Sequence, residues 1–296
     1  MNVLFRVDSS SDIGLGHLMR CFVLAEQYRH NDITFAAQSL KGNFNQKIID
    51  KGYKLVILNG NSIDELCKNI ELLHINNVVF DHYGIDYKFE KSVKEKTGVQ
   101  ILSFDDIYEK HYCDVLLNHN IYADARQYEG LVPEFCDVRC GKKYTLIRDE
   151  FKKVKIKKSP INKESPVIFV CLGGADPDNV SLAVLKILVE FDNATITLAT
   201  TSANRNIGKL QDFSKQCQNI SICVDCNIAE MMSNSDFAVI TPSVIIHEVM
   251  SIGLPFISIK TADNQKMMHK YLCEKNYYAL NLSELSRLKS EVQKYA

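Results

Sequence analysis

Short apolar runs alternate with helical patterns through the first half of the chain. The apolar runs are strand-like and cover residues 3–7, 33–37, 54–58, 78–80, 101–104 and 115–117. After the first run, apolar residues recur at the i, i+3, i+4, i+7 spacing of an amphipathic helix, at Leu18, Cys21, Phe22 and Ala25. Short buried strands separated by helices are typical of parallel sheets covered on both faces. The first half is therefore predicted to be a doubly wound α/β domain.

The second half repeats this rhythm. Its strand-like runs cover residues 167–172, 196–199, 220–224, 237–240 and 256–259. Helices are predicted over residues 180–189, after the start signal Asp176-Pro177, and over residues 244–252, before Gly253. A second Rossmann-like α/β domain is expected here.

A lysine-rich segment separates the two halves. Residues 152–166 hold six lysines and two prolines, which favours a solvated linker. A nucleic-acid patch is the alternative, but no aromatic residues interleave with these lysines. We therefore expect a domain over residues 1–151, a linker over 152–166 and a domain over 167–296, with the two domains facing one another across a cleft.

Composition narrows the class of protein. The chain has 296 residues, of which 46% are hydrophobic and 24% charged, as in an ordinary globular protein. A net charge of -1 argues against a nucleic-acid binder. No apolar stretch approaches the roughly 18 residues that span a membrane, and residues 1–8 resemble a strand rather than a signal peptide. We expect a cytoplasmic, soluble monomer with no nucleic-acid or membrane partner.

Ten cysteines are scattered along the chain, and two pairs are closely spaced. Neither Cys136 with Cys140 nor Cys223 with Cys226 has the two further ligands that a zinc site needs. The cysteines are interpreted as reduced core residues, and no metal is expected.

Polar side chains follow the predicted strands of the first half. Asp8, Asp81, Tyr83, Asp105 and Asn118 all come at or just after a strand end. In open α/β sheets, ligands bind outside the carboxyl ends of the strands. These residues are expected at the ligand-binding edge.

The loop Gly14-Leu15-Gly16-His17 lies between the first strand and the first helix. Glycines there allow a ligand to approach the backbone, and a helix N-terminus favours anions. The dinucleotide fingerprint would need a third glycine where Met19 stands, and an acid after the second strand, where Gln38 and Ser39 stand. NAD is therefore disfavoured, and no cofactor is expected.

His17 is either a structural residue or a catalytic one. In the first turn of a helix, the positive end of the dipole disfavours the imidazolium, and a neutral histidine can act as general base toward water. The neighbouring glycines and the acid-rich loop favour the catalytic interpretation. Whether Asp8 or Asp12 orients the ring is left open.

The second half holds candidate nucleotide contacts. Gly173 and Gly174 follow a buried strand and indicate either a phosphate contact or a tight turn; with no Gly-Lys-Ser/Thr they are not a P-loop. Ser243 is either an N-cap or part of a helix start that holds a diphosphate. Glu248 suits the adjacent hydroxyls of a ribose. Asn264 lies at the start of the next predicted helix, where it either faces the cleft or caps that helix.

Several stretches together resemble a known family, the UDP-2,4-diacetamido-2,4,6-trideoxy-β-L-altropyranose hydrolases of pseudaminic acid biosynthesis. The matching stretches are residues 6–17, 80–84, 102–106, 128–133, 138–141 and 146–151. The resemblance covers nearly the whole chain and is densest in residues 1–151. The second half looks more generally like the nucleotide domain of B-type glycosyltransferases, which implies that fold for the chain.

The resemblance also implies a reaction. Hydrolases of this family release UDP and the free diacetamido sugar, without a metal, as water attacks the anomeric carbon with inversion. His17 matches the catalytic base. The sugar site is expected to include Asp12, Gly16, Arg20, Tyr83 and Asn264. The UDP site is expected to include Gly173, Gly174, Ser243 and Glu248.

Two other functions stay open. An inverting UDP-sugar glycosyltransferase would share the UDP site but would need an acceptor pocket. A non-catalytic UDP-sugar-binding partner of a synthetase would tolerate the loss of His17.

Overall fold

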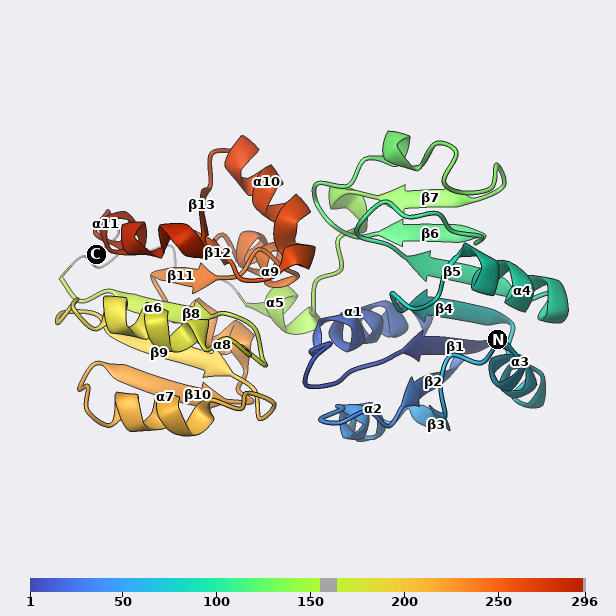
Figure 1. The fold of residues 1–296 in the computed structure, drawn as a ribbon, viewed down its shortest axis with the longest axis horizontal. Coiled ribbons are helices and arrows are strands. Elements are labelled where there is room, and N and C mark those ends of the chain that lie inside the picture. Colours follow the sequence, from blue (N-terminus) through green and yellow to red (C-terminus); the bar gives the residue numbers. More distant parts are fainter. Residues whose placement is uncertain (155–163, 295–296) are drawn as a thin grey trace. The chain divides into compact units, whose positions relative to one another are not determined.

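A computed structural model describes residues 1–154 and 164–294. The chain forms two compact units, Met1–Leu146 and Ile147–Ala296 (Figure 1). The division comes slightly earlier than the end of the predicted first domain at residue 151. Residues 155–163 of the predicted linker lie outside the described residues. The predicted domain bounds thus stay a prediction, and each unit is described by itself.

Unit 1 is built on a seven-stranded sheet whose strands all pair in parallel. The strands are β1 (Asn2–Val7), β2 (Asp32–Gln38), β3 (Lys54–Leu58), β4 (Asn77–Asp81), β5 (Gln100–Phe104), β6 (Val115–Asn118) and β7 (Asp137–Cys140). Their order across the sheet is β3-β2-β1-β4-β5-β6-β7. The helices are α1 (Gly16–Ala25), α2 (Asn45–Asp50), α3 (Ile63–Leu72) and α4 (Tyr87–Thr97), with short 3-10 turns η1 (Glu26–Tyr28), η2 (Ala125–Tyr128) and η3 (Lys142–Tyr144).

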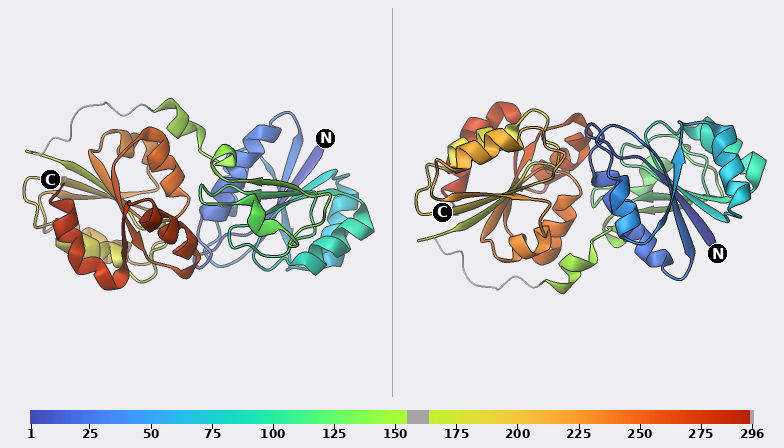
Figure 2. Two further views of the ribbon diagram at one scale, coloured as in Figure 1. Left: turned by 90° about the horizontal axis from the view of Figure 1, so that it is seen from above. Right: turned by 90° about the horizontal axis from the view of Figure 1, so that it is seen from below.

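Helices cover both faces of this sheet (Figure 2). On one face, Leu4 and Phe80 share a buried core with Leu66 of α3 and Val93 of α4. Toward the other face, Phe35 of β2 stacks on Phe5 at 5.0 Å and meets Phe22 of α1 at 5.4 Å. Because both faces are covered, β1 is buried at five of its six positions, and apolar residues run from Val3 to Phe5 without alternating.

Unit 2 is built on a six-stranded parallel sheet. Its strands are β8 (Val167–Cys171), β9 (Thr195–Thr200), β10 (Ile220–Val224), β11 (Phe237–Ile240), β12 (Phe256–Lys260) and β13 (Tyr278–Asn281), in the order β10-β9-β8-β11-β12-β13. Its helices are α5 (Asp149–Lys153), α6 (Val180–Leu188), α7 (Ile207–Ser214), α8 (Ile228–Ser233), α9 (Ile245–Ile252), α10 (Lys266–Glu274) and α11 (Leu288–Val292), with 3-10 turns η4 (Asp263–Gln265) and η5 (Leu282–Arg287).

The first six strands of unit 1 follow the same order as the six strands of unit 2. In each, the first strand of the unit lies beside the fourth, β1 beside β4 and β8 beside β11, and the strand order reverses there. The carboxyl ends of such a strand pair are where open α/β sheets bind ligands. The predicted fold class, two doubly wound α/β domains, is confirmed.

Details of the elements differ from the sequence-based expectation in two places. The edge strands β7 and β13 were not predicted. Each is four residues long, and Asp137 and Arg139 of β7 alternate with less polar residues on a half-exposed edge. The predicted helix over residues 180–189 is present as α6, but it begins at Val180, after Asn179, and not at the start signal Asp176-Pro177. The Asp176 carboxylate lies before this helix and accepts hydrogen bonds from the backbone N–H of Val180 and Ser181, both at 2.9 Å.

One cysteine prediction is wrong. Cys223, at the end of β10, and Cys226 form a disulfide. Their separation of three residues, across the turn that leaves the strand, brings the two side chains together. Among the described helices, none combines the length and apolar character needed to cross a membrane.

Candidate active site

The loop that follows β1 is fixed by its own hydrogen bonds. The Gly14 N–H donates to the Ser10 carbonyl at 2.9 Å, and the Ser10 hydroxyl accepts from the backbone N–H of Asp12 and Ile13 at 3.1 and 2.9 Å. Gly14 has φ +81°, a left-handed conformation that favours glycine. The loop delivers the chain into α1, whose second residue is His17.

His17 is paired with a buried carboxylate on the neighbouring strand. Its Nδ1 lies 2.6 Å from Oδ1 of Asp81. The His17 side chain is 12% exposed, whereas that of Asp81 is 1% exposed. Asp81 ends β4 and lies opposite Val7 of β1, so the parallel register places it beside the start of the His17 loop. Both hydrogen-bonding contacts of the His17 ring with described residues are made by Nδ1, so Nε2 is open to a further partner.

Arg20 lies one turn after His17 and joins two carboxylates. Its Nε and one terminal nitrogen donate to Asp81 at 2.7 and 2.5 Å, and its other terminal nitrogen donates to Asp106 at 3.0 Å. The guanidinium also lies 4.9 Å from the ring centre of Phe104. Arg20 is 5% exposed, so its guanidinium is bound largely within the protein. Its predicted contact with the sugar stays a prediction.

Tyr83 is an exposed aromatic residue that contacts both His17 and Asp106. Its side chain is 52% exposed, and its hydroxyl lies 3.1 Å from both carboxylate oxygens of Asp106. Its ring meets that of His17 edge to face at 4.9 Å between centres. The structure therefore brings together His17, Arg20 and Tyr83, three of the predicted site residues. Gly16 precedes them directly, and Asp12 lies exposed in the same loop.

The surrounding charges and burial set the protonation states of Asp81 and Tyr83. Burial alone would raise the pKa of Asp81, but the charges and hydrogen bonds of Arg20 and His17 hold it well below its usual range. Burial and the neighbouring Asp106 carboxylate raise the pKa of Tyr83 well above its usual value. Asp81 is therefore an anion and Tyr83 a neutral phenol at physiological pH.

Neither acid considered from the sequence holds the Nδ1 of His17. Asp8 accepts hydrogen bonds from Arg6 at 2.7 and 2.8 Å, from Gln38 and from Nε2 of His82 at 2.9 Å. The partner is Asp81, which sequence reasoning placed on the ligand edge without giving it this role. The sequence feature that pointed to Asp81 was a carboxylate at the end of a buried apolar strand.

The predicted glycine pair in unit 2 has a structural account. Gly173 follows β8 with φ +95°. A Cβ on Gly174 would lie 2.8 Å from Thr201 Cγ2, and the Gly174 carbonyl accepts from the Thr201 hydroxyl at 2.9 Å. The close approach of the chain after β9 thus accounts for Gly174, and a phosphate contact at either glycine stays a prediction.

Ser243 and Glu248 follow β11, and β11 is the strand that pairs with β8. Ser243 does not cap α9, which begins after Val244; its hydroxyl instead lies 3.0 Å from that of Thr241. Glu248 is 4% exposed, and both of its oxygens accept from Arg148, at 2.6 and 2.9 Å. Asn264 is exposed within η4. Tyr83 and Asn264, both predicted for the sugar, belong to different units.

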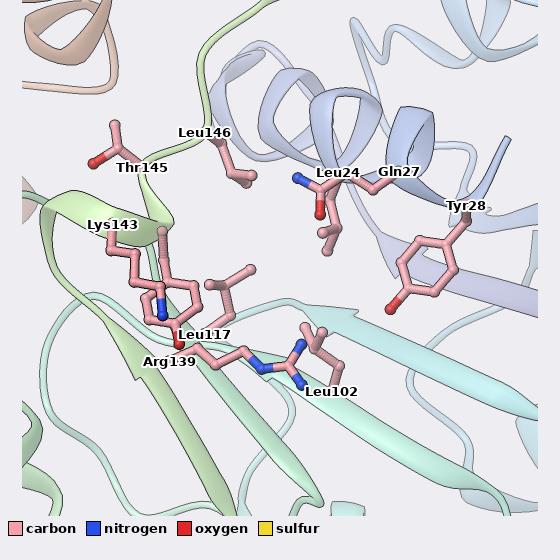
Figure 3. Close-up of a pocket in the computed structure, with 10 residues that line it drawn as sticks. Leu24, Gln27, Tyr28, Leu102, Leu117, Arg139, Lys143, Thr145 and Leu146 are labelled. Carbon is pink, nitrogen blue, oxygen red and sulfur yellow. The ribbon is translucent and has the colours of Figure 1, made fainter.

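A separate cavity of about 180 Å³ opens on unit 1 (Figure 3). Arg139 from β7 and Tyr28 from η1 project into it, above an apolar floor that includes Leu102 and Leu117. We use the name His17 group for His17, Arg20, Asp81, Tyr83 and Asp106. None of the residues that line the cavity belongs to this group. In the described ranges, no group of three His, Cys, Asp or Glu side chains could hold a metal ion.

Comparisons with known proteins identify the relatives of this chain. No family model matches it. The UDP-2,4-diacetamido-2,4,6-trideoxy-β-L-altropyranose hydrolase of Campylobacter jejuni is 42% identical over 279 residues, which cover 94% of this chain and 98% of the relative. The spore coat polysaccharide biosynthesis protein SpsG of Bacillus subtilis is 22% identical over 90% of this chain and 79% of its own length.

Solved structures agree on the fold. MurG of Acinetobacter baumannii has a TM-score of 0.63 and 13% identity, over 99% of this chain and 90% of that one. HepE of Anabaena, solved in complex with UDP and glucose, has the same TM-score and identity, over 99% and 89% of the two chains. These likenesses show a glycosyltransferase B-type fold. The near full-length 42% identity shows more, and the chain belongs to the family of UDP-2,4-diacetamido-2,4,6-trideoxy-β-L-altropyranose hydrolases.

Proposed function

We propose that the protein hydrolyses UDP-2,4-diacetamido-2,4,6-trideoxy-β-L-altropyranose to UDP and the free diacetamido sugar, a step in pseudaminic acid biosynthesis. One observation carries this proposal, the 42% identity to the Campylobacter jejuni hydrolase over almost the whole of both chains. The proposal includes a cytoplasmic, monomeric enzyme with no nucleic-acid or membrane partner.

His17 is assigned as the base that activates water. A water bound at Nε2 attacks the anomeric carbon and gives its proton to Nε2 as the new C–O bond forms. The bond between that carbon and the diphosphate oxygen breaks, and UDP leaves with the electron pair, so the configuration inverts. A base positioned in this way contributes about 10²–10⁴-fold to the rate. Because UDP is a good leaving group, the reaction needs no strong general acid.

Unit 1 is assigned the chemistry and unit 2 the nucleotide. Tyr83 is a suitable sugar contact, since it is exposed beside His17 and its position is set by Asp106. For UDP, the candidates are Gly173 and Ser243, which follow the adjacent strands β8 and β11, and Glu248 on α9. Backbone N–H groups at these strand ends would stabilise the leaving diphosphate.

An inverting UDP-sugar glycosyltransferase is the second candidate, because the fold is shared with such enzymes. The two functions differ in what receives the sugar. A hydrolase releases UDP with water alone, whereas a transferase needs an acceptor hydroxyl.

The deciding experiment uses the UDP-diacetamido sugar in ¹⁸O-water with no acceptor. Mass spectrometry of both products is expected to find one ¹⁸O in the sugar and none in UDP. Label in UDP would place the attack at phosphorus and rule out the proposed step. Absence of UDP release without an acceptor, followed by release when one is added, would favour the transferase.

A further inference from the structure

We propose that Asp81 is a positioning residue that fixes His17 in one tautomer, with the proton on Nδ1 and the lone pair on Nε2. Its catalytic consequence rests on the proposed function, in which Nε2 accepts the proton of water. The tautomer itself is a property of the free protein and can be measured without substrate.

The contact between the two side chains determines the direction of the hydrogen bond. The Nδ1 of His17 and Oδ1 of Asp81 are 2.6 Å apart. Asp81 is an anion, because Arg20 and His17 hold its pKa well below the usual range, so it has no proton to donate. A lone pair on Nδ1 would face a carboxylate lone pair at this distance and be repelled. The contact is attractive when Nδ1 carries the proton.

Arg20 could oppose this tautomer, because one of its terminal nitrogens lies 3.0 Å from Nδ1 of His17. That same nitrogen donates to Asp81 at 2.5 Å, and Nε donates to the second oxygen of Asp81 at 2.7 Å. The guanidinium is thus directed at the carboxylate, and the 3.0 Å approach to Nδ1 is the longer contact. We assign Arg20 to holding Asp81 in place, with Asp106 as its second anchor.

A second histidine on the same sheet edge shows the opposite arrangement. The Nδ1 of His82 accepts from the backbone N–H of Gly84 at 2.9 Å, so its proton is on Nε2, which donates to Asp8 at 2.9 Å. Both nitrogens of His82 are therefore engaged, and His82 offers no base. Of these two histidine–aspartate pairs, His17 with Asp81 leaves the histidine Nε2 available, whereas His82 with Asp8 does not.

The first test is nitrogen NMR on the whole wild-type protein labelled with ¹⁵N-histidine, at a pH where the rings are neutral. Spectra of His17→Leu and His82→Gln assign the two rings. His17 is expected to show a protonated Nδ1 and a bare Nε2, and His82 the reverse. A His17 ring protonated on Nε2 in the wild-type protein would overturn the proposal, and this readout needs neither substrate nor turnover.

The second test is Asp81→Asn. The amide oxygen of the substituted side chain would accept from Arg20, so its NH₂ would face Nδ1 of His17 and move the ring proton to Nε2. We expect kcat to fall about 10²–10⁴-fold, the contribution of a positioned base, while KM changes less than about threefold. The NMR signature of His17 should invert. Wild-type kcat in this variant, or an unchanged tautomer, would refute the role of Asp81.

Glu90→Gln is the matched control. Glu90 is a fully buried carboxylate that, like Asp81, is bonded to a histidine Nδ1, that of His111 at 2.8 Å, but it lies on α4 outside the His17 group. Its substitution should destabilise the fold and keep kcat within about threefold of wild type. An equal kcat loss in both variants would assign the effect of Asp81 to stability. If the wild-type protein did not hydrolyse the nucleotide sugar, the proposed function would fail, and the NMR result would still decide the tautomer.

Discussion

The ion pair between Glu248 and Arg148 bears on the ribose contact that is proposed for Glu248. Burial raises the pKa of Glu248, while the hydrogen bonds and charge of Arg148 oppose that rise. Both carboxylate oxygens already accept from Arg148. Each oxygen has a second lone pair, so the carboxylate can also accept from ribose hydroxyls. Arg148 therefore orients the carboxylate, and in the proposed function this orientation serves the ribose contact.

From this geometry we predict that Glu248→Gln weakens UDP binding. A hydrogen bond to a charged group is worth about 1.5–3 kcal/mol, so the Kd should rise roughly 10- to 100-fold in calorimetry. The Kd of 2′,3′-dideoxy-UDP should change little, because it lacks the hydroxyls. Glu150→Gln is the control, since Glu150 also binds Arg148, at 2.7 Å, but is more exposed. Equal losses for both nucleotides would mean that Glu248 acts by packing alone.

At the scale of elements, a buried histidine connects α4 to the chain after β5. Glu90 of α4 accepts from Nδ1 of His111, from the Ser103 hydroxyl of β5 at 2.6 Å and from the Tyr112 N–H at 2.6 Å. Burial lowers the pKa of His111, but the neighbouring carboxylates of Asp105 and Glu90 outweigh it and raise the pKa from 6.5 to about 10. His111 is therefore a buried cation at neutral pH.

This raised pKa predicts a pH dependence of stability. The folded protein holds a proton on His111 that the unfolded chain releases near pH 6.5. The stabilisation is thus complete below about pH 6.5 and is lost as the pH rises toward 10. Between these limits the free energy of unfolding in urea should fall by up to about 1.4 kcal/mol per pH unit. His111→Gln should remove this slope; parallel slopes in the two proteins would contradict the assignment.

At the scale of the whole molecule, the chain carries the same order of six strands twice, with a seventh strand in unit 1, and has different residues at the two switch points. Unit 1 has Asp81 at the end of β4 and His17 in α1, after the loop that follows β1, whereas unit 2 has Gly173 and Ser243 after β8 and β11. Chemistry and nucleotide binding are therefore assigned to separate units. Substitutions in the two units should then act on different measured quantities.

We predict that His17→Leu abolishes turnover to the limit of detection while the Kd of UDP stays within about threefold of wild type. The double variant His17→Leu with Glu248→Gln should bind UDP as weakly as Glu248→Gln alone, because effects of independent sites add. Calorimetry and a UDP-release assay measure the two quantities. Turnover retained by His17→Leu would remove His17 from the role of base.

The sequence by itself determined the repeating strand-helix pattern, because strands buried on both faces must be apolar, and helices between them must show a period of about 3.6 residues. It also placed His17 at the first helix start and Glu248 in the helix after β11. It missed β7 and β13, since short, half-exposed edge strands lack the continuous apolar signal. The dense match of residues 1–151 to one family gave the reaction.

The partner of His17 was decided by the tertiary structure. Asp81 is 64 residues away from His17 in the chain, whereas Asp8 and Asp12 are close neighbours in sequence. Strand order is set by how the crossover helices pack on the two faces, and the local sequence pattern of a strand does not record which strand will lie beside it. Because β4 pairs with β1, the carboxylate at the end of β4 meets the histidine at the start of α1, and His17 becomes one half of a hydrogen-bonded pair.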